Sequence, residues 1–300
     1  MKNFLSISDL SASHIKQLVK TAVALKGEIK EKGTHADPPL KNKSMAMIFD
    51  KSSLRTRLSF EIGMTQFGGH AVYLAPDDIK LGVRESVHDS AKVISSMADI
   101  IIARISSHEA IKELAQYSSV PVINAMTDLE HPCQALADLQ TIYEKFGTLE
   151  GLKLSYVGDA DANVINSIAL AAEILGLELA IAAPKGYEMA PKIAKQAPSV
   201  KRYNDPAQAV KGAQVVITDT WVSMGKESES KQRLEKLAPF QVTAELMALA
   251  DPKAIFLHCL PAYRGKEVTT EVIDGTQSAV FDEAENRLHA QKAVVLELLT

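Results

Sequence analysis

Residues 45–67 read MAMIFDKSSLRTRLSFEIGMTQF, and the fold can be worked out from this stretch. Its first five residues are an unbroken apolar run, as in a strand that is buried on both faces of a parallel sheet. Further on, apolar residues recur at helical spacing until Gly68 and Gly69 end the pattern. The stretch therefore predicts a buried strand that leads directly into a helix.

The same alternation of strand and helix runs along most of the chain, in two series separated by the loop 147–151. In the first series we expect strands at 45–49, 70–74, 100–103 and 120–124, and helices at 54–67, 86–97, 111–117 and 132–146. In the second we expect strands at 153–157, 177–182, 215–218, 254–258 and 280–281, and helices at 163–175 and 287–299. Two such series predict an α/β protein with two doubly wound domains, each a mostly parallel sheet flanked by helices, joined by a bridging helix.

The composition is that of an ordinary globular protein, and it narrows the classes of partner. The chain has 300 residues, of which 46% are hydrophobic and 23% are charged, and its formal net charge is -4. No basic bias favours nucleic acid or an anionic membrane as a partner. The N-terminus lacks the apolar core of a signal peptide, and the two cysteines suggest no disulfide framework. We therefore expect a soluble cytoplasmic protein.

Ligands of parallel sheets bind beyond the carboxyl ends of the strands, and three of these ends in the first series are followed by hydrogen-bond donors. The donor groups are Ser53, Arg55, Thr56 and Arg57 at the start of a helix, then Arg104, then His131 and Gln134 in the run His131-Pro132-Cys133-Gln134. Hydroxyls, guanidinium groups and free backbone N–H groups at a helix start form a cradle for an anion. The plainer interpretation is a capped helix with solvated arginines and a packed histidine.

The second series opens with a turn, Gly158 to Asn163, that invites comparison with a dinucleotide-binding site. The pattern G-x-G-x-x-G fails there, because Ala160 and Asn163 occupy the later glycine positions. We therefore do not expect NAD.

Two later strand ends carry an acid and a thiol. Asp219 precedes a loop that contains Gly225, which suits either an ammonium group under a mobile lid or an ordinary capped loop. The run His258-Cys259-Leu260-Pro261 follows another strand. In an extended chain His258 and Cys259 point to opposite faces, so we expect no metal site. Cys259 has no nearby base in the sequence that would activate it as a nucleophile.

Taken in order, these motifs resemble the carbamoyltransferases, and most closely the ornithine carbamoyltransferases. The matching segments are Ser53-Leu54-Arg55-Thr56-Arg57, Arg104, His131-Pro132-Cys133-Gln134, residues 219–225, His258-Cys259-Leu260-Pro261, and residues 281–287 with the sequence FDEAENR. The resemblance covers essentially the whole chain. It implies a carbamoyl-phosphate-binding domain at 1–131 plus 285–300 and an ornithine-binding domain at 132–284. It also implies a homotrimer, or a multiple of trimers, with active sites at subunit interfaces.

The resemblance also implies a role for each matching residue. Carbamoyl phosphate is expected to be bound by Ser53, Leu54, Arg55, Thr56, Arg57, Arg104, His131, Gln134 and Arg287. Ornithine is expected to be bound by Asn163, Asp219, Ser223, Met224, Cys259 and Leu260, with Leu260-Pro261 a cis peptide. The residues expected to take part in the chemistry are Arg55, Thr56, Arg104, His131 and Cys259. No cofactor and no metal are expected.

The reaction implied is transfer of the carbamoyl group from carbamoyl phosphate to the δ-amine of L-ornithine, which gives L-citrulline and phosphate. The alternatives are a carbamoyltransferase for a related amine, such as putrescine or an N-acylornithine, and a non-catalytic protein on the same fold. The sequence departs from the family pattern at Leu54, where Thr is usual, and at Ala162, where Asn is usual. Lys80 stands where related enzymes often place Gln in a loop that reaches a neighbouring subunit, so Lys80 or Arg84 is a candidate for that contact.

Overall fold

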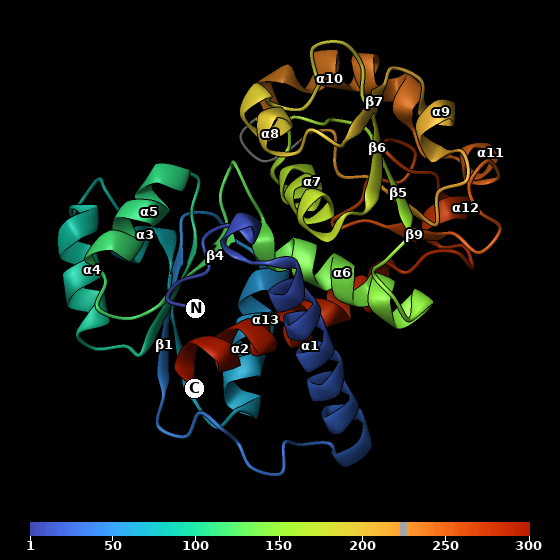
Figure 1. The fold of residues 1–300 in the computed structure, drawn as a ribbon. Helices are drawn as coiled ribbons and strands as arrows, with labels where there is room; N and C mark the ends of the chain where they lie inside the picture. Colours follow the sequence, from blue (N-terminus) through green and yellow to red (C-terminus); the bar gives the residue numbers. More distant parts are fainter. Residues whose placement is uncertain (223–226) are drawn as a thin grey trace. The chain divides into compact units, whose positions relative to one another are not determined.

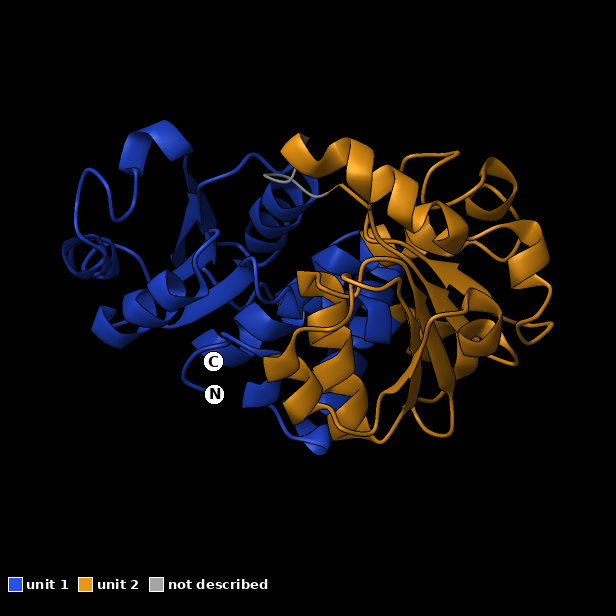
Figure 2. Cartoon of the chain, turned by 90° about the horizontal axis from the view of Figure 1, so that it is seen from above, with its two compact units in different colours: residues 1–140, 285–300 blue, residues 141–284 orange. Residues whose placement is uncertain are grey.

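The computed structural model describes residues 1–222 and 227–300. They divide into two compact units, Met1–Gln140 with Glu285–Thr300 and Thr141–Ala284, which Figure 2 draws in blue and orange. The division falls within two helices, α6 (Pro132–Phe146) and α13 (Val280–Leu299). The boundary expected before residue 132 would lie at the start of α6. Each unit contains a parallel sheet with helices around it, so the predicted fold class is confirmed (Figure 1).

The sheet of the first unit has four strands in the order β2-β1-β3-β4, and each neighbouring pair is parallel. Its strands are β1 (Ser44–Phe49), β2 (His70–Leu74), β3 (Ile100–Arg104) and β4 (Val122–Met126). Its helices are η1 (Ile7–Asp9), α1 (Ala12–Lys32), α2 (Leu54–Gln66), α3 (Pro76–Ile79), α4 (Val87–Ser95) and α5 (His108–Tyr117). The strand order reverses direction between β1 and β3, and a ligand crevice is expected at such a switch point. The loops that follow these two strands are joined there, because Asp50 N donates to Arg104 O at 3.0 Å.

The sheet of the second unit has five parallel strands in the order β7-β6-β5-β8-β9. Its strands are β5 (Lys153–Val157), β6 (Glu178–Ala182), β7 (Lys201–Tyr203), β8 (Val215–Ile217) and β9 (Ile255–Leu257). Its helices are α7 (Asn163–Leu175), α8 (Pro191–Gln196), α9 (Pro206–Val210), η2 (Glu227–Glu229), α10 (Ser230–Leu237), η3 (Ala238–Phe240), α11 (Ala244–Met247) and α12 (Thr270–Ile273). The switch point here lies between β5 and β8, next to the segments that contain Asn163 and Asp219.

The expected strand at 280–281 is wrong, because these residues form the first turn of α13. The segment just before α13 pairs with β9 through an isolated bridge between Ser278 and Phe256. Val280 is then fully buried whereas Phe281 is 68% exposed. Two apolar residues are too few to reveal a period, so the sequence pattern could not separate a short strand from a helix start.

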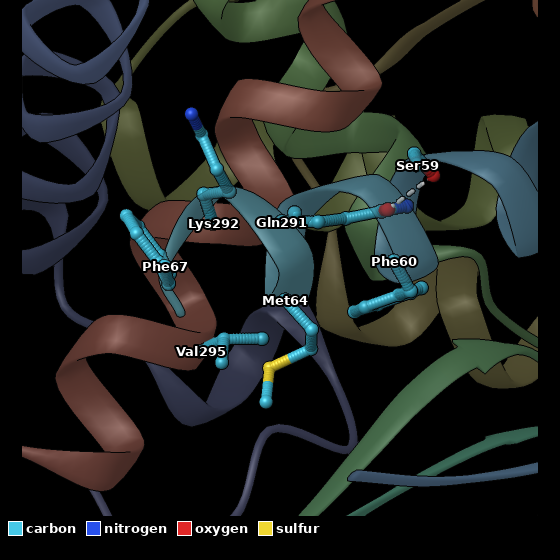
Figure 3. Close-up of a pocket in the computed structure, with 8 residues that line it drawn as sticks. Ser59, Phe60, Met64, Phe67, Gln291, Lys292 and Val295 are labelled. Atoms are coloured by element: carbon cyan, nitrogen blue, oxygen red, sulfur yellow. Dashed lines mark hydrogen bonds between the residues drawn. The ribbon is translucent and has the colours of Figure 1, made fainter. Parts of the chain in front are cut away.

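Helices α2 and α13 pack closely within the first unit, around the small cavity shown in Figure 3. Buried Lys292 of α13 donates to Gln66 Oε1 at 2.7 Å and contacts His35 Nε2 at 2.9 Å. The other ring nitrogen of His35 lies 2.6 Å from Glu28 Oε2. Burial lowers the pKa of Lys292 to about 8, against the opposing effect of Glu28. The ammonium group lies beside the last residue of α2, where a cation is favourable to the helix dipole.

One buried arginine connects three strand-end loops of the second unit. The Arg233 guanidinium of α10 forms an ion pair with Asp159, in the loop after β5. Its Nε donates to Trp221 O, after β8, at 2.7 Å, and it lies over the ring of Tyr187, after β6, at 5.0 Å. Because Arg233 and Asp159 are both buried, each supplies the partner that the other charge needs in the interior. The placement of the loops near Asn163 and Asp219 therefore depends on Arg233.

Within residues 1–222 and 227–300, every helix is too short or too polar to cross a membrane.

Two glycines inside helices should respond in opposite ways to substitution by alanine. A Cβ at Gly63 of α2 would lie 3.1 Å from Lys292 Cγ, whose side chain is held at its far end. A Cβ at Gly27 of α1 would meet nothing within 4 Å. We expect Gly27→Ala to raise the free energy of unfolding by about 0.5–1 kcal/mol. We expect Gly63→Ala to lower it, because the close packing of α2 on α13 must open. Urea denaturation of both variants tests this, and equal stabilisation by both would contradict it.

Candidate functional site

The candidate residues of the first unit gather around the N-terminus of α2. Ser53 is the N-cap, and its side-chain oxygen accepts from Thr56 N at 3.3 Å. Leu54, the first helical residue, is 73% exposed, so the missing hydroxyl of the family's usual threonine leaves no buried gap. The helix start presents unpaired backbone N–H groups and the positive end of the helix dipole. The local structure is therefore suited to an anion.

The Thr56 hydroxyl is the point at which two distant arginines meet. Arg104, the last residue of β3, donates to Thr56 Oγ1 at 3.4 Å. Arg287, from α13, donates to the same oxygen at 3.2 Å and to Gln134 Oε1 at 2.8 Å. Thr56, Arg104, Gln134 and Arg287 are all buried. Because the two arginines occupy the acceptor sites of the hydroxyl, its proton is the group that can be donated to a ligand.

His131 lies beside these arginines and is uncharged at neutral pH. Burial lowers the pKa of His131 well below its usual range, and the positive charges of Arg287, Arg104 and Arg55 lower it further. A neutral imidazole has one N–H group, which can donate a hydrogen bond to a carbonyl oxygen without adding charge. The backbone carbonyl of His131 accepts from Gln134 N at 3.0 Å, which fixes the first turn of α6.

Arg57 points away from this group. Its Nε donates to Glu61 Oε1, one turn later in α2, at 2.9 Å, and its guanidinium lies 3.9 Å from the centre of the Tyr73 ring. Its side chain is half exposed. Arg55 is nearer to the buried residues, as its effect on His131 shows. The structure therefore brings Ser53, Thr56, Arg104, His131, Gln134 and Arg287 together, with Arg55 near them and Arg57 turned to one side.

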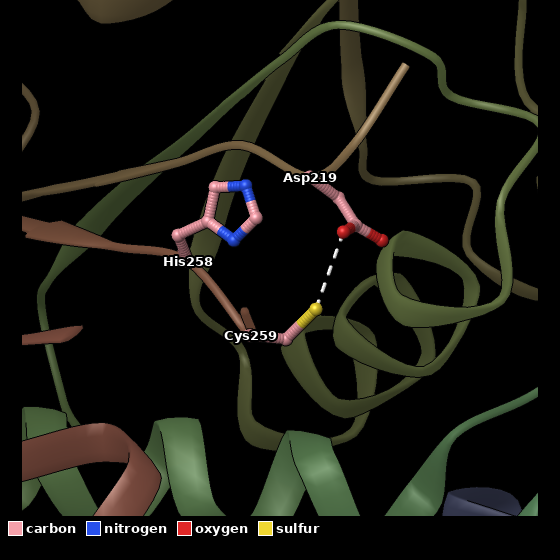
Figure 4. Close-up of side chains that lie close together, drawn as sticks. All are labelled: Asp219, His258 and Cys259. Atoms are coloured by element: carbon pink, nitrogen blue, oxygen red, sulfur yellow. Dashed lines mark hydrogen bonds between the residues drawn. The ribbon is translucent and has the colours of Figure 1, made fainter. Parts of the chain in front are cut away.

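In the second unit, Asp219 and Cys259 form the centre of the candidate site (Figure 4). The Cys259 thiol donates to Asp219 Oδ1 at 3.2 Å, and Thr220 N donates to the same oxygen at 2.7 Å. Burial raises the pKa of the Asp219 carboxyl, and His258 and the Cys259 thiol oppose this increase. A buried carboxylate at the end of a strand is a suitable partner for an ammonium group.

His258 supports the turn that carries Cys259. Its Nδ1 accepts from Leu260 N at 2.9 Å, so its Nε2 carries the proton and donates to Glu267 Oε1 at 3.2 Å. The expected cis peptide between Leu260 and Pro261 is confirmed. Sequence reasoning missed Glu267, because a single glutamate in a polar segment gives no signal of being fully buried.

His258 and Cys259 do not point to opposite faces, contrary to the expectation for an extended chain. Ligand atoms of Asp219, His258 and Cys259 lie within 4.8 Å of one another. Strand β9 ends at Leu257, so the extended geometry assumed for His258 and Cys259 does not apply. Both ring nitrogens of His258 already take part in hydrogen bonds, however, and a metal would have to displace one of them.

The remaining predicted residues are placed less fully. Asn163 is the first residue of α7, and Ala162 before it caps the helix without a side-chain hydrogen bond. Ser223 and Met224 lie outside the described residues. Lys80 forms an exposed ion pair with Asp77, at 3.7 Å.

Comparison with known proteins shows to which family the chain belongs. The family model for the carbamoyl-P binding domain of aspartate/ornithine carbamoyltransferase matches residues 2–144, and the model for the Asp/Orn binding domain matches residues 150–298. The chain is 49% identical over 302 residues to the ornithine carbamoyltransferase of Methanosarcina acetivorans, covering 99% of both chains. It is 50% identical over 304 residues to that of Caldicellulosiruptor saccharolyticus, covering 99% of this chain and 98% of the other.

A solved structure gives the same result. The structure superposes on the ornithine carbamoyltransferase from Pyrococcus furiosus with a TM-score of 0.93 at 45% identity, covering 98% of this chain and 96% of that one. Both family models and the full-length similarity agree, and the chain belongs to the aspartate/ornithine carbamoyltransferase family.

Proposed function

We propose that this protein transfers the carbamoyl group of carbamoyl phosphate to the δ-amine of L-ornithine, giving L-citrulline and phosphate. The observation that carries the proposal is the convergence of Arg104 and Arg287 on the Thr56 hydroxyl at the N-terminus of α2. Two buried cations and the N-terminus of a helix are stabilised by an anion. An anionic ligand that has both a phosphate and a carbonyl group matches the hydrogen-bond donors present. The relatives named above carry the name ornithine carbamoyltransferase.

Residues 1–131 plus 285–300 are proposed as the domain that binds carbamoyl phosphate, and Gln134, in the first turn of α6, would add one contact to this ligand. Its phosphate would be bound by Ser53, Arg55, Thr56, Arg57 and the backbone N–H of Leu54. The carbamoyl group would be bound by Arg104, His131, Gln134 and Arg287. Support comes from the hydrogen bonds among these buried side chains, which hold their donors in place before the ligand arrives.

Residues 132–284, which include the whole second unit, are proposed as the domain that binds ornithine. Asp219 would accept from the ammonium group, and the other contacts would come from Asn163, Ser223, Met224, Cys259 and Leu260. The Cys259 thiol keeps one oxygen of Asp219 hydrogen-bonded before the ligand arrives. Cys259 therefore serves to orient the carboxylate rather than to attack the substrate.

The chemistry needs charge stabilisation but no covalent intermediate. The neutral δ-amine attacks the carbonyl carbon, and a tetrahedral oxyanion forms beside Thr56, Arg104 and His131. The bond from the carbonyl carbon to the phosphate oxygen then breaks, Arg55 and Arg57 stabilise the departing phosphate, and the amine proton leaves with it. Removing one such donor typically lowers the rate by about 10²–10³. No step requires a cofactor.

A homotrimer, or a multiple of trimers, is part of the proposal. Support comes from exposed apolar side chains on the first unit, among them Leu58, Ile62, Val72 and Val83. Leu58 and Ile62 lie one turn apart on α2, and exposed apolar residues that lie together in this way are typical of protein interfaces. Lys80 and Arg84 stay candidates for a contact with a neighbouring subunit's site.

The substrate assignment is tested by measuring carbamoylated product with L-ornithine, L-aspartate, putrescine and N-acetyl-L-ornithine in parallel. Turnover with L-ornithine alone is expected, because Asp219 would bind an α-ammonium group, which N-acetyl-L-ornithine lacks, and would repel the second carboxylate of L-aspartate. Putrescine lacks the α-carboxylate that the other proposed contacts would bind. Turnover with putrescine or N-acetyl-L-ornithine would leave the proposed carbamoyl phosphate site unchanged. That amine would then replace L-ornithine as the proposed acceptor of the carbamoyl group. Turnover with none of them would contradict the proposal.

The role of Arg57 is tested by removing the charge of Glu61, which would compete with the phosphate group for the Arg57 guanidinium. If Arg57 binds phosphate, it must leave Glu61, so Glu61→Gln should lower the KM for carbamoyl phosphate by up to about fivefold. Glu113→Gln, at an exposed glutamate of α5, is the matched control and should change nothing. An unchanged KM in Glu61→Gln would remove Arg57 from the phosphate site.

The pH profile follows from the protonation states. Ornithine reacts as the neutral amine, whose pKa should be near the usual value of about 10 for a primary amine, so kcat/KM for ornithine should rise roughly tenfold per pH unit between about pH 7 and 9. His131 should add no second slope there, because its pKa lies well below its usual value. Initial rates at saturating carbamoyl phosphate test this. A break near neutral pH that disappears in His131→Gln would contradict the assignment of a neutral His131.

A further inference from the structure

Gln291 of α13 is a buried polar residue that the proposed reaction does not use. It lies one helical turn after Arg287, and only 1% of its surface is exposed. Its side chain reaches across to α2 and meets the hydroxyl of Ser59 at 2.5 Å, as Figure 3 shows. Its amide therefore connects the helix that carries Arg287 with the helix that carries Thr56.

The orientation of the Gln291 amide follows from its neighbours. The single proton of the Ser59 hydroxyl is donated to Arg55 O at 2.6 Å, so the hydroxyl must accept from Gln291. The amide nitrogen then faces Ser59, and the amide oxygen accepts from Arg287 Nε at 3.1 Å and Nη2 at 2.9 Å. A guanidinium can only donate, so both contacts select the same orientation.

This contact fixes the guanidinium of Arg287 in its plane. Gln291 holds its Nε and Nη2, Thr56 accepts from Nη2, and Gln134 accepts from Nη1. We propose that Gln291 is a positioning residue, which aims Arg287 at the carbamoyl end of carbamoyl phosphate through the link to Ser59; the inference rests on the function proposed above. The amide is neutral, so it orients the arginine without cancelling the positive charge that an anionic substrate needs.

Lys292, the next residue of α13, provides a matched control. It is as buried as Gln291 and also connects α13 to α2, but it contacts Gln66 at the far end of α2, together with His35. Lys292→Met keeps an unbranched side chain that is only one atom shorter, and it removes the polar contacts of the ammonium group. It therefore disturbs the packing of the same two helices without touching Arg287.

The test compares Gln291→Met and Lys292→Met with the wild-type enzyme in steady-state citrulline formation. In Gln291→Met we expect the KM for carbamoyl phosphate to rise about tenfold, because Arg287 loses a fixed acceptor. The KM for ornithine and the inhibition constant of inorganic phosphate, which lacks the carbamoyl group, should stay within about twofold. In Lys292→Met all three constants should stay near the wild-type values, whatever happens to the melting temperature.

Two results would overturn the inference while leaving the proposed function intact. One is an active Gln291→Met variant with an unchanged KM for carbamoyl phosphate. The other is an equal increase in Lys292→Met, since general displacement of α13 would then be the cause. A wild-type enzyme that forms no citrulline would count against the proposed function itself, and the inference would fall with it.

Discussion

Arg104 and Arg287 are far apart in the chain, yet both donate to the buried hydroxyl of Thr56. Bringing two cations to one oxygen in the interior is unfavourable unless dipoles and a counter-charge compensate for it. The chain as a whole carries a net charge of -4, so this positive region is a local construction. Strand β3 supplies one arginine, α13 supplies the other, and α6 supplies Gln134 as an acceptor. An anionic ligand would complete the set.

In the second unit the buried charged group is a carboxylate, which is placed to bind a cation. Asp219 is buried, and a thiol and a backbone N–H group hold one of its oxygens. The neighbouring ion pair of Asp159 with Arg233 is fully compensated and serves to connect loops. Burial raises the pKa of Asp219, and a raised pKa often marks a residue that awaits a ligand. In each unit, therefore, a buried charged group lies at the switch point of a parallel sheet, where it can bind a ligand of opposite charge.

Much of the architecture could be predicted from the sequence because buried parallel strands are continuous apolar runs. The strands at 45–49 and 100–103 are predictable for this reason. β7 was not, since Lys201 and Arg202 lie on an exposed edge and give no apolar pattern. Residues 280–281 were assigned to the wrong element because two apolar residues carry no period.

The candidate site was predictable in its residues but not in its connections. Motifs at strand ends pointed to Thr56, Arg104, His131 and Asp219, since topology alone places them at the edges of the sheets. The joining of Arg287 to Thr56 depends on how α13 packs against α2, which spacing along the chain does not reveal. Gln291 and Glu267 are single polar residues within otherwise ordinary segments, and only the structure shows that they are buried.

The Thr56 hydroxyl organises the carbamoyl phosphate site, and substitution by two residues of similar size separates its hydroxyl from its shape. Carbamoyl phosphate turnover would be compared in Thr56→Ser, which keeps the hydroxyl, and Thr56→Val, which keeps the shape. We expect Thr56→Ser to stay within about tenfold of the wild-type kcat/KM and Thr56→Val to lose about 10²-fold or more. If Thr56→Val were as active as Thr56→Ser, the two arginines would need no shared acceptor and the hydroxyl would not organise the site.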